Sequence, residues 1–165
     1  MRCALSVVVL CLTAGYPALA IENQRKTPTL TLSLTFPDRL AVRLGLQLAL
    51  DSLDRPGCAA IYEEFELRDG CTPQCELDRR RIGPKELLKT LVFADGSRDP
   101  FCHNGRAFLT TTPGRFLIHV CPGFAQLQSR LRASLILHES LHALGLGENP
   151  PSSKEITNRV ERRCS

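Results

Sequence analysis

Residues 124–144 constrain the fold more than any other part of this chain, because their apolar side chains recur with the period of an α-helix. His138 and His142 fall on the same stripe as the leucines, four residues apart. Gly145 and Gly147 follow, and glycine commonly ends a helix. A helix with a long apolar side has to bury that side against another layer of structure. The pattern therefore predicts one long helix that carries two histidines on its buried side.

Shorter periodic segments surround this helix. Period-two alternation predicts three strands, over residues 29–36, 106–111 and 115–121, and the last two flank a turn sequence of hairpin length. Helical spacing predicts three further helices, from Asp38 to a stop at Pro56-Gly57, over residues 84–92, and after a capping box of Ser152 and Glu155. The rest of residues 58–101 is expected to form loops held by cysteines. The expected fold class is α+β, with a short sheet or hairpin packed on the histidine helix.

The first twenty residues have the pattern of an export signal. Arg2 gives a positive start, residues 4–13 are almost entirely apolar, and Ala18-Leu19-Ala20 offers the small residues that a signal peptidase requires. Because the apolar run is too short to span a bilayer, we expect a cleaved signal and no membrane span. Cys11 leaves a lipoprotein anchor as the alternative. The prediction is a secreted or periplasmic protein with a single domain over residues 21–165.

Six of the eight cysteines lie beyond the predicted signal. An even number of cysteines in an exported chain predicts three disulfides, although the sequence does not choose their pairing. A cysteine metal site at Cys71 and Cys75 is the competing interpretation, and it lacks a second cysteine pair at ligand spacing. The six are Cys58, Cys71, Cys75, Cys102, Cys121 and Cys164.

Composition and charge narrow the class of protein. With 43% hydrophobic residues, the chain is too apolar to remain disordered. The formal net charge of +4 is small, and the basic runs at residues 79–81 and 162–163 are short and bordered by acidic residues. No nucleic-acid partner is therefore expected. The composition carries no signal for an oligomeric state.

The sequence His138-Glu139-Ser140-Leu141-His142 carries the chemistry. Histidines four residues apart leave a helix one above the other, so both can direct a ring nitrogen at one zinc ion. Glu139 would lie beside the metal and act as the general base. A catalytic zinc site usually has a third protein ligand. No histidine or aspartate follows His142, so a downstream ligand has to be Glu148, Glu155 or Glu161.

Glu148 is the preferred third ligand. Gly145 would let the chain leave the helix sharply and bring the carboxylate of Glu148 back toward the histidines. Glu155 is the rival, but the capping box explains that residue without a metal. His103, in an expected loop, and His119, on an expected strand, are more often structural or solvated, although either could supply a ligand or stabilise an oxyanion.

The residues from His138 to Glu148 resemble the extended zinc signature of metzincin peptidases, H-E-x-x-H-x-x-G-x-x-H or -D, with Glu148 in the last place. This resemblance implies a small zincin-like domain in which His138, His142 and Glu148 bind Zn²⁺ and Glu139 is the general base. It also implies that the strand at residues 116–121 holds substrate by edge pairing. The chain departs from the family in its third ligand and in having no methionine beyond Met1.

Together these features predict a secreted zinc metallopeptidase that acts on a protein or peptide. Hydrolysis of a non-peptide amide, such as a cell-wall crosslink, would use the same site. The alternative from a different class is a non-catalytic secreted module, stabilised by metal or disulfides, that binds another protein.

Overall fold

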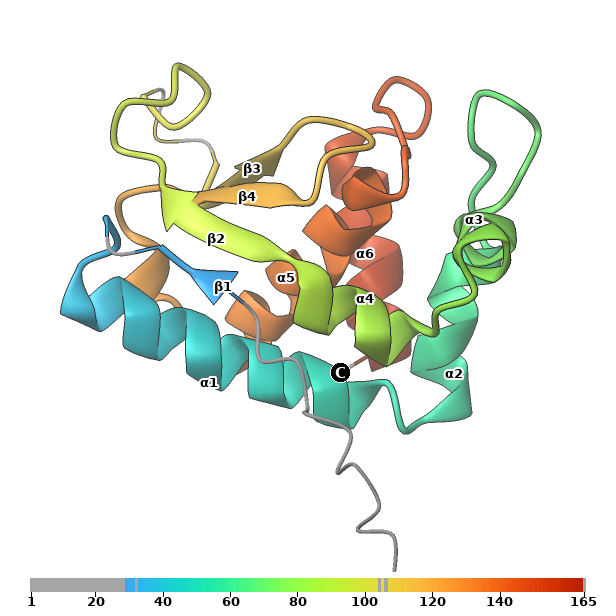
Figure 1. Cartoon of the computed structure of the whole chain (residues 1–165), viewed down its shortest axis with the longest axis horizontal. Helices are drawn as coiled ribbons and strands as arrows, with labels where there is room; N and C mark the ends of the chain where they lie inside the picture. Colours follow the sequence, from blue (N-terminus) through green and yellow to red (C-terminus); the bar gives the residue numbers. More distant parts are fainter. Residues whose placement is uncertain (1–28, 32, 104, 106, 165) are drawn as a thin grey trace, which may run out of the picture.

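The computed structural model describes residues 29–31, 33–103, 105 and 107–164, and it has a mixed α+β architecture (Figure 1). Within these residues six α-helices and two short 3₁₀ helices accompany one four-stranded sheet. The predicted fold class is confirmed. In chain order the elements are β1 (Thr29–Leu30), α1 (Phe36–Ser52), α2 (Pro56–Ala59), η1 (Ala60–Glu63), α3 (Pro73–Arg80), α4 (Pro84–Thr90), β2 (Val92–Asp95), β3 (Leu109–Thr111), β4 (Leu117–Val120), η2 (Phe124–Gln126), α5 (Ser129–Ala143) and α6 (Ser153–Cys164).

The sheet has the strand order β1-β2-β4-β3, in which β1, β2 and β4 are parallel and β3 is antiparallel to β4. The predicted hairpin is confirmed, because Leu109 pairs with Val120 and Thr111 pairs with Ile118. The prediction that residues 116–121 offer a free edge is wrong, since β4 is paired on both sides. The parallel strand β2, which sequence analysis did not identify, pairs with β4 on the side away from β3. The hairpin strand at the edge of the sheet is therefore β3 and not β4.

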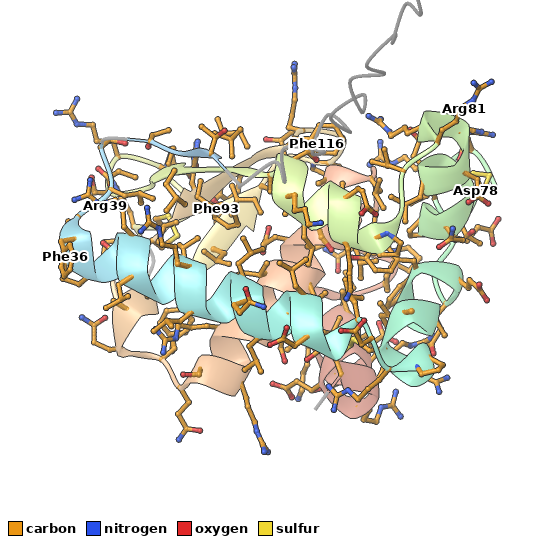
Figure 2. The ribbon with its side chains drawn as sticks, turned by 60° about the horizontal axis from the view of Figure 1, so that its bottom comes forward. Phe36, Arg39, Asp78, Arg81, Phe93 and Phe116 are labelled. Carbon is orange, nitrogen blue, oxygen red and sulfur yellow. A yellow bond between two sulfur atoms is a disulfide. The ribbon has the colours of Figure 1, made fainter. Side chains whose placement is uncertain are left out.

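Helices α1 and α5 pack against each other beneath one face of the sheet (Figure 1). Phe93 of β2 and Ile118 of β4 are fully buried in the core beneath the sheet, and Figure 2 shows Phe93 between the sheet and α1. The two helices approach closely at Gly45, where a Cβ would lie 3.1 Å from Ile136 Cδ1. Glycine at this position therefore lets α1 come near the helix that carries the histidines.

The predicted strand over residues 29–36 is too long. The strand ends at Leu30, and Phe36 begins α1 with its side chain 70% exposed at the end of the helix (Figure 2). Thr35 is the N-cap, and its side chain accepts a hydrogen bond from the backbone N–H of Asp38. Capping by threonine and a proline in the first turn start a helix here, so these local signals override the period-two alternation.

Three disulfides are present in the described part of the chain, as predicted. Cys58–Cys164 joins α2 to the end of α6, Cys71–Cys75 closes the start of α3, and Cys102–Cys121 ties the loop after β2 to the end of β4. The alternative of a metal site at Cys71 and Cys75 is wrong, because those two sulfurs are bonded to each other.

The predicted signal at residues 1–20 lies outside the described residues. Among the residues that the structure does describe, no helix has both the length and the apolar character needed to cross a bilayer. The expectation of no membrane span agrees with this finding.

Candidate metal centre

Helix α5 carries both histidines in its last two turns. The predicted long helix is interrupted, because residues 124–126 form a separate 3₁₀ turn and α5 begins only at Ser129. His138 and His142 are 3% and 5% exposed, which confirms that they lie on the buried side. Gly145, with a φ of 107°, ends the helix, and its N–H donates to the carbonyl of His142. This left-handed residue turns the chain back along the helix.

The turn brings Glu148 to the two histidines. The Nε2 atoms of His138 and His142 are 2.9 Å apart, and Glu148 Oε1 lies 3.5 Å from His142 Nε2 and 4.0 Å from His138 Nε2. Ligands of a tetrahedral zinc ion at about 2.0–2.1 Å are separated from one another by about 3.3–3.4 Å. The three donor atoms therefore need to move by less than about 1 Å to hold one ion.

The remaining ring nitrogens of the histidines are held by other parts of the fold. His142 Nδ1 lies 2.6 Å from the carbonyl oxygen of Leu146, and His138 Nδ1 lies 3.0 Å from Thr157 Oγ1. Because a carbonyl can only accept, His142 Nδ1 carries a proton, and in the neutral imidazole Nε2 is then the nitrogen with the lone pair. Such partners of the second ring nitrogen are typical of histidines that bind metals, since they orient the ring and fix its tautomer.

The protonation state of His138 favours the binding of a metal cation. Burial, and after it the nearby ring of His142, lowers the pKa of His138 to about 3. The imidazole is therefore neutral near pH 7, which is the form that binds metals. A 2.9 Å contact between two Nε2 atoms is satisfied by a proton on His138 Nε2 or by a cation that both lone pairs bind.

Two imidazoles and one carboxylate suit zinc and other first-row dications. The three side chains form a group whose donor atoms all lie within 4.8 Å of one another. The side chain of Glu148 is 41% exposed, whereas the histidine side chains are almost fully buried. The group is therefore open to solvent on the side of Glu148, where a further ligand could enter.

Glu139 is buried with an unused acceptor. It is 6% exposed, and its Oε2 has no hydrogen-bond partner among the described residues. Burial, followed by the charge of Glu148, raises the pKa of Glu139 to about 8, while a hydrogen bond from the backbone of Thr111 opposes this shift. Thr111 belongs to the edge strand β3. A carboxyl group in this environment can hold a proton near neutral pH.

Two residues that support α5 escaped sequence analysis. Tyr62 of η1 lies 2.7 Å from Ser140 Oγ, and Ser140 Oγ in turn donates to the carbonyl of Leu137. Burial raises the pKa of Tyr62, against a smaller effect of its hydrogen bond to Ser140. The other residue is Thr157 of α6. A lone tyrosine and a lone threonine, far from the histidines in sequence, give no signal of such contacts.

The rival ligands lie elsewhere. Glu155 Oε2 accepts hydrogen bonds from the N–H and the hydroxyl of Ser152, as the predicted capping box requires. His119 Nδ1 contacts Asp99 Oδ2, and His103 Nε2 lies 3.0 Å from the carbonyl of Ser97. Among the described residues, the structure brings only Glu148 to the two histidines as a third metal-ligating side chain.

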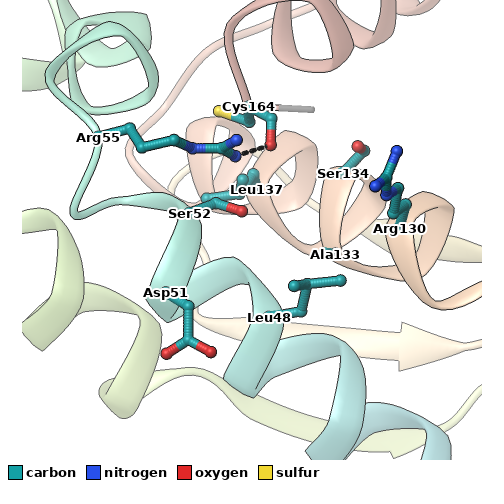
Figure 3. Close-up of a pocket in the computed structure, with 9 residues that line it drawn as sticks. All are labelled: Leu48, Asp51, Ser52, Arg55, Arg130, Ala133, Ser134, Leu137 and Cys164. Carbon is teal, nitrogen blue, oxygen red and sulfur yellow. Dashed lines mark hydrogen bonds between the residues drawn. The ribbon is translucent and has the colours of Figure 1, made fainter.

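A cavity of about 320 Å³ lies between α1, α5 and the end of α6 (Figure 3). Leu48, Ala133 and Leu137 line it together with Arg55 and Arg130. None of the residues that line it belongs to the histidine–glutamate group. The three side chains that could hold a metal therefore lie outside this cavity.

Comparison with known proteins adds no further information: no family model, no curated protein and no solved structure matches this chain. The functional argument therefore rests on the residues and their geometry. The arrangement can hold a dication between the buried imidazoles of His138 and His142 and the carboxylate of Glu148. The buried carboxyl group of Glu139 lies directly after His138 in the helix.

Proposed function

We propose that this protein is an exported zinc-dependent metallopeptidase. The convergence of His138 Nε2, His142 Nε2 and Glu148 Oε1 carries this proposal, because these atoms come from a helix and the turn after it and face one point. Packing alone gives no reason to bury two neighbouring imidazoles whose Nε2 atoms face each other. When bound, zinc supplies a Lewis acid that polarises a carbonyl and activates water near neutral pH.

Glu139 moves the proton in the proposed reaction. Its carboxylate accepts a proton from the attacking water and delivers it to the leaving amine of the cleaved peptide. The orphaned Oε2 atom supports this role, since a buried acceptor without a partner is poised to receive a proton. The raised pKa agrees with a group that both accepts and donates near neutral pH.

The edge strand β3 supports a peptide as the substrate. Thr111 of β3 contacts Glu139 through its backbone, so the free edge of the sheet lies beside the proposed general base. An extended peptide can add to such an edge through main-chain hydrogen bonds. The resemblance predicted that substrate pairs with residues 116–121. We propose instead that substrate pairs with β3, at residues 109–111.

The disulfides support export. Three disulfides in a chain of this size are typical of oxidising compartments outside the cytosol. Secretion or export to a periplasm, with removal of residues 1–20, remains part of the proposal.

A metal and turnover assay tests the proposal. Residues 21–165, produced under oxidising conditions, are expected to bind one zinc ion and to cleave an unfolded protein, and a chelator should abolish cleavage. Glu139→Gln is expected to keep the zinc and to lose about 10²–10⁴-fold in rate. Glu161→Gln, on the last helix, is the matched control and should retain activity.

Two results would contradict the proposal. Full activity in a zinc-loaded Glu139→Gln protein removes the general base. Stoichiometric zinc without turnover on any substrate favours the non-catalytic binding module instead.

A further inference from the structure

The loop between η1 and α3 places a guanidinium against the metal-binding turn. Arg68 is exposed, and its Nε and Nη2 atoms lie 3.8 Å and 3.9 Å from the position that a Cβ would occupy at Gly147. Gly147 stands between Leu146, whose carbonyl accepts from His142 Nδ1, and Glu148, whose carboxylate faces both histidines. Leu146 thus holds one histidine, Gly147 lies near Arg68, and Glu148 faces both histidines.

The charge of Arg68 is not neutralised within its own loop. The adjacent carboxylate, Asp69, pairs with Arg79 at 2.8 Å and accepts a hydrogen bond from the N–H of Cys71. Among the described residues, Arg68 has no ion-pair or hydrogen-bond partner. Its guanidinium is therefore available to an anionic group that arrives from solvent, and guanidinium binds carboxylates strongly because it can donate two parallel hydrogen bonds.

The backbone around Arg68 is held in place. The N–H of Leu67 donates to the carbonyl of Cys71 at 2.7 Å, and the N–H of Gly70 donates to the carbonyl of Leu67 at 3.0 Å. The disulfide between Cys71 and Cys75 ties the end of this loop to the first turn of α3. A charged group on a constrained loop loses less entropy on binding than one on a free loop.

Arg68 lies near the turn that carries the carboxylate of Glu148, because Arg68 Nε is 3.8 Å from the position of a Cβ at Gly147. Neighbouring Cα atoms are about 3.8 Å apart, and Gly147 directly precedes Glu148, the proposed third ligand. An extended peptide advances about 3.3 Å per residue. An extended peptide that runs over this turn therefore brings successive residues past Arg68.

We propose that Arg68 binds a carboxylate of the substrate, so that this protein prefers peptides with an anionic group near the scissile bond. The carboxylate belongs to an aspartate or glutamate side chain or to the C-terminus of the peptide. This inference rests on the proposed peptidase function. Arg68 is then a residue that determines specificity. The sequence motif that named the metal ligands and the general base does not include it.

Peptide libraries test the preference. The zinc-loaded protein is incubated with random peptides that end in a free carboxylate or in an amide, and the cleaved bonds are identified by mass spectrometry. The wild-type protein should favour either acidic side chains at one position or the free C-terminus, and that result identifies the source of the carboxylate. For matched acid and amide peptides, we expect a ratio of kcat/KM of about tenfold, mostly through KM.

Substitutions at Arg68 give the decisive comparison. Arg68→Gln should bring the acid-to-amide ratio close to one, and Arg68→Glu should reverse the preference toward basic side chains. Arg43→Glu, at an exposed position of α1, changes the net charge by as much as Arg68→Glu and should leave the ratio as in the wild type. The inference is overturned if the profile of Arg68→Gln equals that of the wild type, or if Arg43→Glu alters it as strongly.

A binding assay separates this inference from the peptidase proposal. Zinc-loaded Glu139→Gln protein is titrated with the acid and amide peptides in a calorimeter, with and without Arg68→Gln. Binding that depends on both Arg68 and the carboxylate, together with no cleavage of any peptide by the zinc-loaded wild-type protein, would retain the Arg68 site and refute the peptidase. Cleavage without any preference for carboxylates would do the reverse.

Discussion

Thr157 should control the zinc affinity although it touches no metal. Its Oγ1 lies 3.0 Å from His138 Nδ1, whereas His142 is held separately by the carbonyl of Leu146. Thr157→Val keeps the shape of the side chain and removes this oxygen. Loss of such an outer partner typically costs 10–100-fold in metal affinity. Because the anchor of His142 remains, we expect the lower end, about tenfold or about 1.4 kcal/mol.

Competition with a chromogenic zinc chelator at constant pH measures the affinity. Thr90→Val is the matched control, because the hydroxyl of Thr90 takes part in one hydrogen bond, to the carbonyl of Leu87, at a place distant in sequence from the histidines. An unchanged zinc affinity in Thr157→Val refutes the reasoning. An equal loss in Thr90→Val refutes it too, since the effect would then be a general loss of stability.

Three further predictions concern stability. Because the pKa of Tyr62 is raised in the folded state, its contribution is present below the unfolded pKa of about 10 and is lost above it, so alkaline denaturation of wild type should show a steeper fall than Tyr62→Phe. Replacing Cys58 and Cys164 by serine opens a connection across 106 residues and should lower the free energy of unfolding in urea by up to about 4.7 kcal/mol. Gly45→Val places new methyl groups against Ile136, where a Cβ would already be 3.1 Å away, and should cost about 1–3 kcal/mol in thermal unfolding. A wild-type Tm in that variant would contradict the close approach of α1 and α5.

Predictions that depend on neighbouring residues agree with the structure. The capping box of Ser152 and Glu155 and the helix end at Gly145 appear in the structure where they were predicted. The hairpin of β3 and β4 was also predicted, because its turn and its alternation lie within a few residues of each other. These features depend on the conformations and hydrogen bonds of neighbouring residues, so a sequence window contains their cause.

Non-local pairing was the unreliable part. The parallel strand β2 is short and has no clear alternation, so sequence analysis placed residue 92 at the end of a helix, left residues 93–95 in a loop region and assigned a free edge to β4. The first strand was drawn too long because alternation of leucine and threonine continues into the first turn of α1. A short strand without alternation is recognised only from the strands that pair with it, and the strands that pair with β2 are distant in the chain.

The spacing of His138, Glu139 and His142 on one helix was set by the sequence alone, and so was the sharp turn that brings Glu148 near them, because helical geometry and a positive φ at glycine are local properties. Tertiary structure decided what surrounds that group: Thr157 behind His138, the edge of β3 beside Glu139, and Arg68 against Gly147. Those contacts join segments that are far apart in the chain, and only the packing of α6, the sheet and the disulfide-closed loop around α5 brings them together.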